Sequence, residues 1–244
     1  MAKHKTELIV ALDVDTLEQT QKLVDLLSPV SFFKVGSQLF TSCGPAAVRF
    51  ILARGKRVFL DLKYHDIPNT VASAVRLAIG LSGAVGNKMS KNAQGISMFT
   101  VHIQGGREMM GAAAKAASEK AKELGLIKPL IVGISVLTSE QKKEGTQALV
   151  LERARLAKSA GLDGVVASLE EAAQIRKELG EDFIIVTPGI RPSGSVAGDQ
   201  KRVGTPKEAV LAGSNFLVVG RPIIESPNPL ETAKKILEEI ETIR

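Results

Sequence analysis

Short apolar segments alternate with longer helical segments eight times along the 244-residue chain. The apolar segments are rich in Val and Ile, which is typical of strands in a parallel sheet that is covered on both faces. These predicted strands are Leu8–Leu12, Ser31–Val35, Arg57–Leu62, Ile96–Val101, Leu130–Ser135, Gly164–Ala167, Phe183–Thr187 and Phe216–Val219. Eight strand–helix units predict an α/β protein, a single (β/α)8 TIM barrel over residues 1–244, and favour it over an open doubly wound sheet.

Each predicted strand is followed by a predicted helix, so the strands run parallel and their carboxyl ends meet at one face of the barrel. In this fold that face carries the active site. The predicted helices are Thr16–Leu27, Gln38–Ala53, Thr70–Ile79, Glu108–Leu124, Thr146–Ser159, Glu170–Leu179, Pro206–Leu211 and Pro229–Ile243.

Two connecting segments are long and rich in glycine. Residues 80–95 join a helix to the next strand, so they lie at the amino-terminal face, away from chemistry, and we expect a mobile insertion. Residues 188–204 follow the seventh strand and lie on the active face. Their Gly and Ser residues permit movement and their Arg and Lys residues suit an anion, so we expect a lid that closes over a phosphate.

The composition excludes several kinds of protein. The single cysteine, Cys43, excludes an intrachain disulfide and a cysteine-rich metal site. Leu8–Leu12 is too short for a signal core or a membrane span, so we expect a soluble cytoplasmic protein with no membrane partner. The net charge of +6 permits a nucleic-acid partner, but basic and acidic residues are interleaved and aromatic residues for base stacking are scarce. A non-catalytic nucleic-acid-binding protein is therefore the least favoured reading.

Charged residues gather where the first three predicted strands end. Asp61 and Lys63 are two residues apart on one strand and so face the same way, and a turn can bring Asp66 back toward the same pocket. Lys34 lies inside the second strand, and Asp13 ends the first. A barrel has no edge, so we expect Lys34 to point into the barrel mouth; helix capping or a structural ion pair remains the alternative for the aspartates.

An alternating array of Lys34, Asp61, Lys63 and Asp66 suits a decarboxylation. Each lysine is held charged by a flanking carboxylate, and a charged lysine can deliver a proton to a developing carbanion. A fixed carboxylate repels a substrate carboxylate, and this repulsion disappears once carbon dioxide leaves. The effect favours the transition state over the ground state.

An anion site is predicted after the last two strands. The seventh strand runs into Gly189-Ile190-Arg191, and the eighth runs into Gly220-Arg221-Pro222. Loops at these positions commonly bind phosphate in this fold, through backbone N–H groups and the start of a short helix. Gly220 permits close approach of the backbone, and Arg221 can bind two phosphate oxygens at once.

Three further polar residues follow the strands. His102 is expected to be a hydrogen-bonded residue of the barrel mouth rather than a base, and His65 is expected to face the loop exterior. Thr138 either bonds a substrate ring or caps the next turn, and the spacing does not decide between the two. No His, Asp and Glu cluster has metal-ligand spacing.

These residues together resemble the orotidine 5'-phosphate decarboxylase family, in its shorter bacterial type (type 1), over nearly the whole chain. Departures from the family pattern are the long segment 80–95 and Ile103-Gln104, where small residues are usual. The resemblance is carried by Ala11-Leu12-Asp13, Phe33-Lys34-Val35-Gly36, the run from Asp61 to Thr70, Val136-Leu137-Thr138-Ser139, Thr187-Pro188-Gly189-Ile190-Arg191, Gly198-Asp199-Gln200-Lys201-Arg202 and Val219-Gly220-Arg221-Pro222-Ile223.

The resemblance implies the conversion of orotidine 5'-phosphate to uridine 5'-phosphate, at the end of pyrimidine synthesis, with neither a metal nor an organic cofactor. Lys63 would donate the proton to C6 of the pyrimidine, and Asp61 would lie against the substrate carboxylate. Asp13 and Lys34 would bind the ribose hydroxyls.

The resemblance also implies roles for the remaining site residues. Asp66 and Thr70 would reach into the neighbouring subunit's site, so the protein would be a homodimer, and the adjoining Ile67 would contact substrate as well. Other implied contacts are Thr138 with the pyrimidine, and Gln200, Gly220 and Arg221 with the phosphate, with Arg191 nearby.

A related barrel that decarboxylates or condenses a sugar phosphate with Mg²⁺ is the alternative. Such barrels share an Asp-x-Lys-x-x-Asp pattern, so that pattern alone does not separate them. The extension Ile67-Pro68-Asn69-Thr70 and the segment Gly198-Asp199-Gln200 favour the metal-free decarboxylase.

Overall fold

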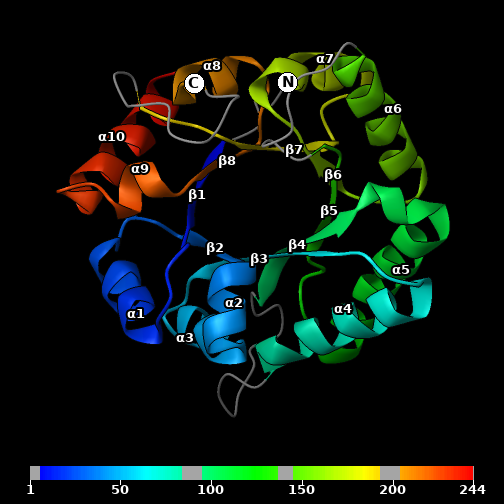
Figure 1. Ribbon diagram of the computed structural model, residues 1–244, viewed down its shortest axis with the longest axis horizontal. Coiled ribbons are helices and arrows are strands. Elements are labelled where there is room, and N and C mark those ends of the chain that lie inside the picture. The colour runs from blue at the N-terminus through cyan, green and yellow to red at the C-terminus, as the bar shows by residue number, and fades with distance from the viewer. Residues whose placement is uncertain (1–5, 84–94, 137–144, 193–203, 244) are drawn as a thin grey trace.

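Eight parallel strands close into a barrel in the order β1-β2-β3-β4-β5-β6-β7-β8, and helices encircle it (Figure 1). The computed structural model describes residues 6–83, 95–136, 145–192 and 204–243. The predicted TIM barrel is thereby confirmed. The strands are β1 (Glu7–Ala11), β2 (Phe32–Gly36), β3 (Arg57–Tyr64), β4 (Ile96–His102), β5 (Leu130–Ile134), β6 (Gly164–Val166), β7 (Ile184–Pro188) and β8 (Phe216–Val219).

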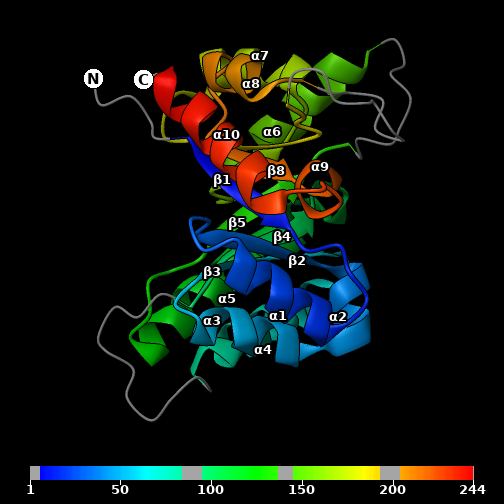
Figure 2. The same ribbon diagram turned by 90° about the vertical axis from the view of Figure 1, so that its left-hand side faces the viewer.

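The helices form the outer layer of the molecule, which a second view shows from the side (Figure 2). A short 3-10 helix, η1 (Ile103–Gly105), follows β4. The α-helices are α1 (Leu17–Leu26), α2 (Ser37–Cys43), α3 (Pro45–Ala53), α4 (Pro68–Gly83), α5 (Gly106–Leu124), α6 (Thr146–Ser159), α7 (Leu169–Leu179), α8 (Pro206–Leu211), α9 (Arg221–Ile224) and α10 (Pro229–Thr242). Within the described ranges, none of these helices is both long and apolar enough to cross a membrane.

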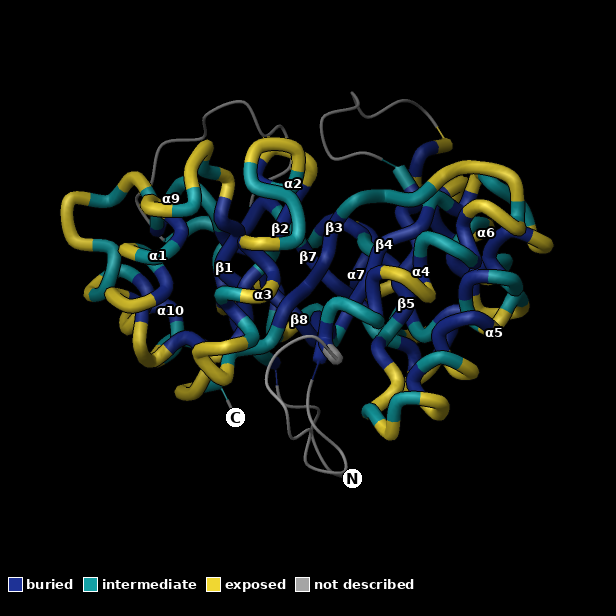
Figure 3. Tube along the Cα trace, turned by 90° about the horizontal axis from the view of Figure 1, so that it is seen from below, coloured by how far each residue is buried: buried dark blue, intermediate teal, exposed yellow. Residues whose placement is uncertain are grey.

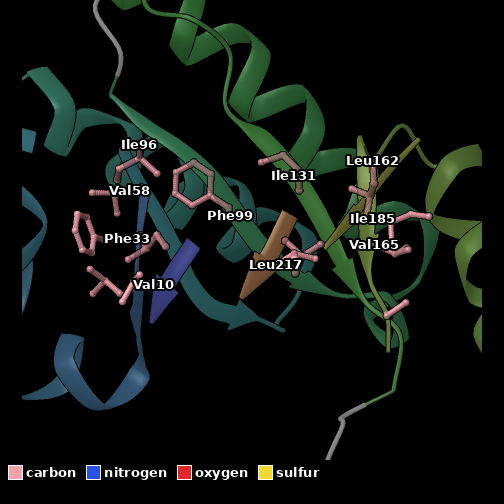
Figure 4. Packing of buried hydrophobic residues seen from close by; sticks show 14 of the residues in the cluster. Val10, Phe33, Val58, Ile96, Phe99, Ile131, Leu162, Val165, Ile185 and Leu217 are labelled. Atoms are coloured by element: carbon pink, nitrogen blue, oxygen red, sulfur yellow. The ribbon is translucent and has the colours of Figure 1, made fainter. Parts of the chain in front are cut away.

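Side-chain alternation along the strands divides the apolar residues between two cores. On β1, Leu8 and Val10 face the helices, whereas Ile9 and Ala11 face the barrel interior. The layer between strands and helices is the larger core (Figure 4), and the strands are buried while exposure follows the outer faces of the helices (Figure 3). The interior core contains Ile9, Ala11, Phe32, Phe59, Met98, Val132, Val186, Phe216 and Val218.

Three helices begin at a capping box, in which the first residue and the residue three positions later bond each other's backbone N–H groups. These boxes stop the helices from extending back into the loops that follow the strands. The pairs are Thr16 and Gln19 at α1, Ser168 and Glu171 at α7, and Thr205 and Glu208 at α8.

Two predicted boundaries were wrong. The helix expected over Gln38–Ala53 is two helices, because Gly44 adopts a φ of 56° and Pro45 has no N–H to continue the first. The segment expected to be a loop from residue 80 is helical up to Gly83, and only residues 84–94 of it lie outside the described part of the chain. Ile96 N–H bonds the Ser82 hydroxyl at 2.9 Å, so β4 begins directly beside the last turn of α4.

Ile103, where the sequence departs from the family pattern, is accommodated by a glycine on the next strand. Ile103 is buried in the outer core, and a Cβ on Gly133 would come within 2.6 Å of its Cγ1 atom. The two positions therefore fit together only because residue 133 has no side chain. The larger residue after β4 thus leaves the barrel interior unchanged.

Candidate active site

Four charged side chains form a continuous chain of ion pairs in the barrel mouth. Lys34 Nζ lies 3.0 Å from Asp13 Oδ1 and 3.7 Å from Asp61 Oδ2. Lys63 Nζ lies 2.9 Å from the same Asp61 Oδ2. All four line one pocket, so Lys34 points into the barrel mouth as predicted.

Asp61 is the centre of this array and its most buried member. Its side chain is 10% exposed, against 34% for Lys63 and 41% for Asp13. Burial alone would raise the pKa of Asp61, but the charges of Lys34 and Lys63, with hydrogen bonds from Lys63 and Thr100, hold it below its ordinary value. Asp61 is therefore a fixed negative charge in a site that excludes much of the solvent.

The backbone at Lys63 departs from regular strand geometry. Its φ is 51°, and it is the one residue other than glycine with a positive φ in the described part of the chain. That conformation costs on the order of 1 kcal/mol for a residue with a side chain and persists only where neighbouring contacts impose it. Strain of this kind is typical of a functional position.

Thr100, on β4, is a buried polar residue that the sequence analysis missed. Its Oγ1 atom lies 2.9 Å from Asp61 Oδ1 and 2.8 Å from the backbone nitrogen of Lys63. The available signal was weak: Thr100 is a polar residue at an inward-facing position of β4, two residues after inward-facing Met98.

Small residues leave room for the array. A Cβ on Gly36 would come within 2.8 Å of Lys34 Nζ and 3.6 Å of Asp13 Oδ1. A Cβ on Gly220 would lie 3.4 Å from Asp13 Oδ2. Any side chain at residue 36 would therefore displace the Lys34 ammonium from between its two carboxylates.

The same pocket also contains the predicted anion-binding residues. Arg191, Gly220 and Arg221 line it, together with apolar residues from β5 to β8. Gly220 precedes α9, a four-residue helix beside the end of β8 (Figure 1). The pocket thus combines the charged array, two arginines and an apolar lining.

The base of the predicted lid is a short bridge between its two ends. Ile190 pairs with Gly204, and Arg191 N–H bonds Gly204 C=O at 2.9 Å. The ends of the segment are thereby fixed beside the pocket. Residues 193–203, which include Gln200, lie outside the described residues, as does Thr138.

Asp66, Ile67 and Thr70 do not join the pocket of their own chain. All three are exposed, Ile67 by 66%. Asp66 Oδ1 accepts the backbone N–H of Ile67 at 2.6 Å. The expectation that a turn returns Asp66 to the same pocket was therefore wrong: Asp66 is not among the residues that line the pocket, and its carboxylate bonds the backbone of the turn that leads into α4.

His65 and His102 lie against one another at the edge of the site. Their ring centroids are 5.2 Å apart, and His65 is exposed as predicted. Burial, followed by the charges of His65, Lys63 and Arg153, lowers the pKa of His102, and Asp61 opposes this only in part. A neutral His102 next to Lys63 adds no positive charge to the array at neutral pH.

Tyr64 is the only tyrosine in the chain and the last residue of β3, so its pKa reports whether the end of this strand is buried. Burial raises the pKa of Tyr64 to about 12 from 10.0. Because the folded protein holds the neutral phenol, its stabilising contribution is complete below pH 10 and is lost as the pH rises toward 12. Phenolate absorbance should appear near pH 12 in the folded protein and near pH 10 in denaturant. A midpoint near 10 while the protein is folded would show that Tyr64 is exposed.

Within the described ranges, no three His, Cys, Asp or Glu residues are grouped as a metal site would require. The two aspartates of the array face lysines instead. Asp61 has one carboxylate oxygen against Lys63 and the other against Thr100, and Asp13 is paired with Lys34. Each of the two carboxylates therefore already has a cationic partner within the array.

Known proteins of one family are similar to this chain over almost its whole length. The model of the orotidine 5'-phosphate decarboxylase / HUMPS family matches residues 6–236. The orotidine 5'-phosphate decarboxylase of Moorella thermoacetica is 47% identical, with 98% of this chain and 94% of the relative covered. That of Geotalea daltonii is 44% identical, with 97% and 96% covered.

A solved structure supports the same assignment. The orotidine 5'-phosphate decarboxylase of Lactobacillus acidophilus superimposes with a TM-score of 0.78 at 32% identity, covering 96% of this chain and 99% of that one. Fold, pocket and sequence therefore agree. This chain belongs to the orotidine 5'-phosphate decarboxylase / HUMPS family.

Proposed function

We propose that this protein decarboxylates orotidine 5'-phosphate to uridine 5'-phosphate and carbon dioxide without a cofactor, as the last step of de novo uridine 5'-phosphate synthesis. The observation that carries the proposal is the ion-pair chain Asp13–Lys34–Asp61–Lys63 in a pocket that Arg191 and Arg221 also line. A nucleotide that carries a carboxylate and a phosphate has charged groups suited to the lysines and arginines of this pocket.

The array supports a simple reaction. Asp61 lies against the substrate carboxylate, and their repulsion ends when the bond from C6 to the carboxylate breaks and carbon dioxide leaves. The electron pair of that bond stays on C6, and the Lys63 ammonium delivers a proton there. Lys63 then regains its proton from solvent. Because Asp61 stays ionised well below neutral pH, the repulsion persists throughout the working range.

Binding of the rest of the nucleotide follows the pocket walls. Asp13 and Lys34 lie where the ribose hydroxyls would bind. Arg221 and Gly220 bind the phosphate with Gln200, Arg191 lies nearby, and the lid over residues 188–204 closes on it. Thr138 contacts the pyrimidine. The bridge between Ile190 and Gly204 supports this arrangement, since it fixes both ends of the lid beside Arg191.

The Mg²⁺-dependent sugar-phosphate reaction is not favoured. It requires carboxylate oxygens that are free for a cation, whereas those of Asp61 already bond Lys63 and Thr100. One assay distinguishes the two functions. Purified protein should consume orotidine 5'-phosphate at the same rate with and without EDTA and should leave hexulose and pentulose phosphates unchanged. Metal-dependent turnover of a sugar phosphate, with orotidine 5'-phosphate untouched, would overturn the proposal.

A homodimer with shared sites is part of the proposal, as is a cytoplasmic location. The run from Asp66 to Thr70 is exposed and carries an isoleucine that is 66% exposed, which is the character of a surface that a second subunit covers. In the dimer, Asp66, Ile67 and Thr70 complete the partner's site and place Asp66 beside the partner's array.

Mixed dimers test this sharing. Lys63→Ala chains and Asp66→Ala chains are each expected to be nearly inactive. When they are combined, one site per mixed dimer receives a wild-type Lys63 from one chain and a wild-type Asp66 from the other, so activity should return to about a quarter of wild type for random pairing. Mixed dimers demonstrated by a tag on one chain but without restored activity would exclude a shared site.

A further inference from the structure

We propose that Thr100 is the positioning residue that holds Lys63 and Asp61 in the geometry required for proton transfer. Thr100 is fully buried and does not line the pocket, so it acts through these two residues and not on the substrate. The inference rests on the proposed decarboxylation for its kinetic consequences, but its structural basis is independent of the substrate.

The backbone of β3 creates the need for such a residue. Leu60 pairs with Phe99 and Tyr64 pairs with Val101, so residues 61–63 of β3 lie opposite the single residue Thr100 of β4. A bulge of this kind leaves backbone groups without their usual partner in the ladder. The N–H of Lys63 is one of them, and it bonds the Thr100 side chain at 2.8 Å instead.

The hydroxyl of Thr100 accepts one hydrogen bond and donates another. A backbone N–H can only donate, so the oxygen of Thr100 accepts from Lys63, and its single hydrogen is left for Asp61 Oδ1 at 2.9 Å. Lys63 Nζ bonds the other oxygen, Asp61 Oδ2, at 2.9 Å. The three bonds close a ring that runs from the Lys63 backbone through Thr100 and Asp61 to the Lys63 ammonium.

This ring fixes both ends of the lysine. At the backbone end, the bond to Thr100 holds Lys63 at its φ of 51°, a conformation that a residue with a side chain rarely adopts. At the other end, both oxygens of Asp61 are occupied, so the carboxylate cannot rotate and the ammonium keeps its position. The methyl group of Thr100 packs in the barrel interior and is not part of the ring.

Two variants separate the effect of the Thr100 hydroxyl from the effect of the side chain's shape, and a third is a control. Thr100→Val keeps the shape and removes the hydroxyl, and we expect kcat to fall by about 100-fold, which is typical of a small misplacement of reacting groups. KM for orotidine 5'-phosphate and the Kd for uridine 5'-phosphate should stay within about twofold, because the nucleotide contacts are untouched. Thr100→Ser keeps the hydroxyl and should retain kcat within about threefold. Thr6→Val is the matched control, since Thr6 is buried and bonds Ser214 C=O at 2.8 Å at the opposite end of the barrel.

A merely structural role for Thr100 predicts a different set of results. It predicts equal kcat for folded Thr100→Val and wild type, or equal losses in Thr100→Val and Thr6→Val, and either result overturns the proposal. A 100-fold loss in Thr100→Ser would also overturn it, even if the valine variant does not fold. If Thr100 is the positioning residue, the fall of kcat/KM at acidic pH should begin at a higher pH in Thr100→Val than in wild type. The reason is that the variant lacks a hydrogen bond that lowers the pKa of Asp61.

The same experiment separates failure of this inference from failure of the proposed function. If the wild-type protein is inactive on orotidine 5'-phosphate, the result counts against the proposed function but not against the role of Thr100. In that case the carboxyl carbon of Asp61, followed by NMR through a pH titration, still tests the ring. Its midpoint should be higher in Thr100→Val than in wild type and Thr100→Ser. Coincident midpoints in all three proteins would exclude the bond on which the inference depends.

Discussion

Lys63→Ala is expected to reduce kcat on orotidine 5'-phosphate by about 10⁴-fold, because it removes the ammonium that we propose protonates C6. Lys34, the other lysine of the array, is held between Asp13 and Asp61 at 3.0 and 3.7 Å, and we propose that it binds the ribose hydroxyls instead. Steady-state kinetics with the nucleotide, followed by its loss of ultraviolet absorbance, give the measurement.

The control for this variant lies at the other end of the same strand. Lys56 precedes β3 and bonds Ser28 C=O at 2.7 Å, so Lys56→Ala removes one lysine charge without touching the pocket and should keep full turnover. Lys63→Ala also leaves Asp61 with one cation fewer, so the pKa of Asp61 rises; the variant therefore loses stability at neutral pH, where Asp61 is ionised, and the loss shrinks at acidic pH as Asp61 is protonated. Circular dichroism at neutral pH should show both variants folded. A folded Lys63→Ala protein with more than about a tenth of wild-type kcat would refute the proton-donor role.

Arg176→Ala is expected to lower the free energy of unfolding by about 3 kcal/mol, since it removes six side-chain hydrogen bonds, four of them part-buried. Arg176, on α7, is 11% exposed and crosses the amino-terminal face of the barrel between the loops that precede β7 and β8. Its guanidinium bonds the carbonyl oxygens of Gly180, Glu181, Phe183 and Gly213 and the side chain of Asn215 at 2.6–3.2 Å. Thermal unfolding should shift down by about 6–12 °C for a chain of this length.

Arg155→Ala is the matched control for Arg176. Arg155 is also a helix arginine, but its side chain is 56% exposed and pairs with Glu178 at the surface. Such pairs contribute less than about 1 kcal/mol, so the shift in Tm should be small. Arg176 lies at the end of the barrel opposite the array, so kcat per folded molecule should not change in either variant. Equal Tm values for the two variants would mean that the guanidinium of Arg176 is replaceable by water.

The fold could be predicted from the sequence because each barrel strand is a short apolar segment. Each outer helix is a longer segment in which apolar residues recur at helical spacing. The strand bounds lie within two residues of the prediction, and those of β8 match it. The errors occurred where single residues override the pattern. Gly44 and Pro45 split a predicted helix in two, and a Gly-Pro pair was the available signal. Apolar residues at helical spacing carry α4 on to Gly83, into a segment that its glycines suggested was a loop.

The site could be predicted only in part, for a physical reason. Lys34, Asp61 and Lys63 are charges on apolar strands, and charge in a buried strand is visible in a sequence. Thr100 is a small polar residue that fits any strand, and its contact with Lys63 depends on a bulge in the pairing of β3 with β4. Pairing register of that kind is a property of two strands together and cannot be derived from either one alone.

We propose that the array performs the decarboxylation without a metal or cofactor, and a single-turnover experiment tests this. Orotidine 5'-phosphate labelled with ¹³C in its carboxyl group is mixed with excess enzyme in EDTA and followed by NMR. We expect the carboxylate signal to be replaced by carbon dioxide and bicarbonate while one C6–H signal of uridine 5'-phosphate appears for each label lost. An unchanged carboxylate signal in folded enzyme, or turnover that begins only when Mg²⁺ is added, would contradict the account.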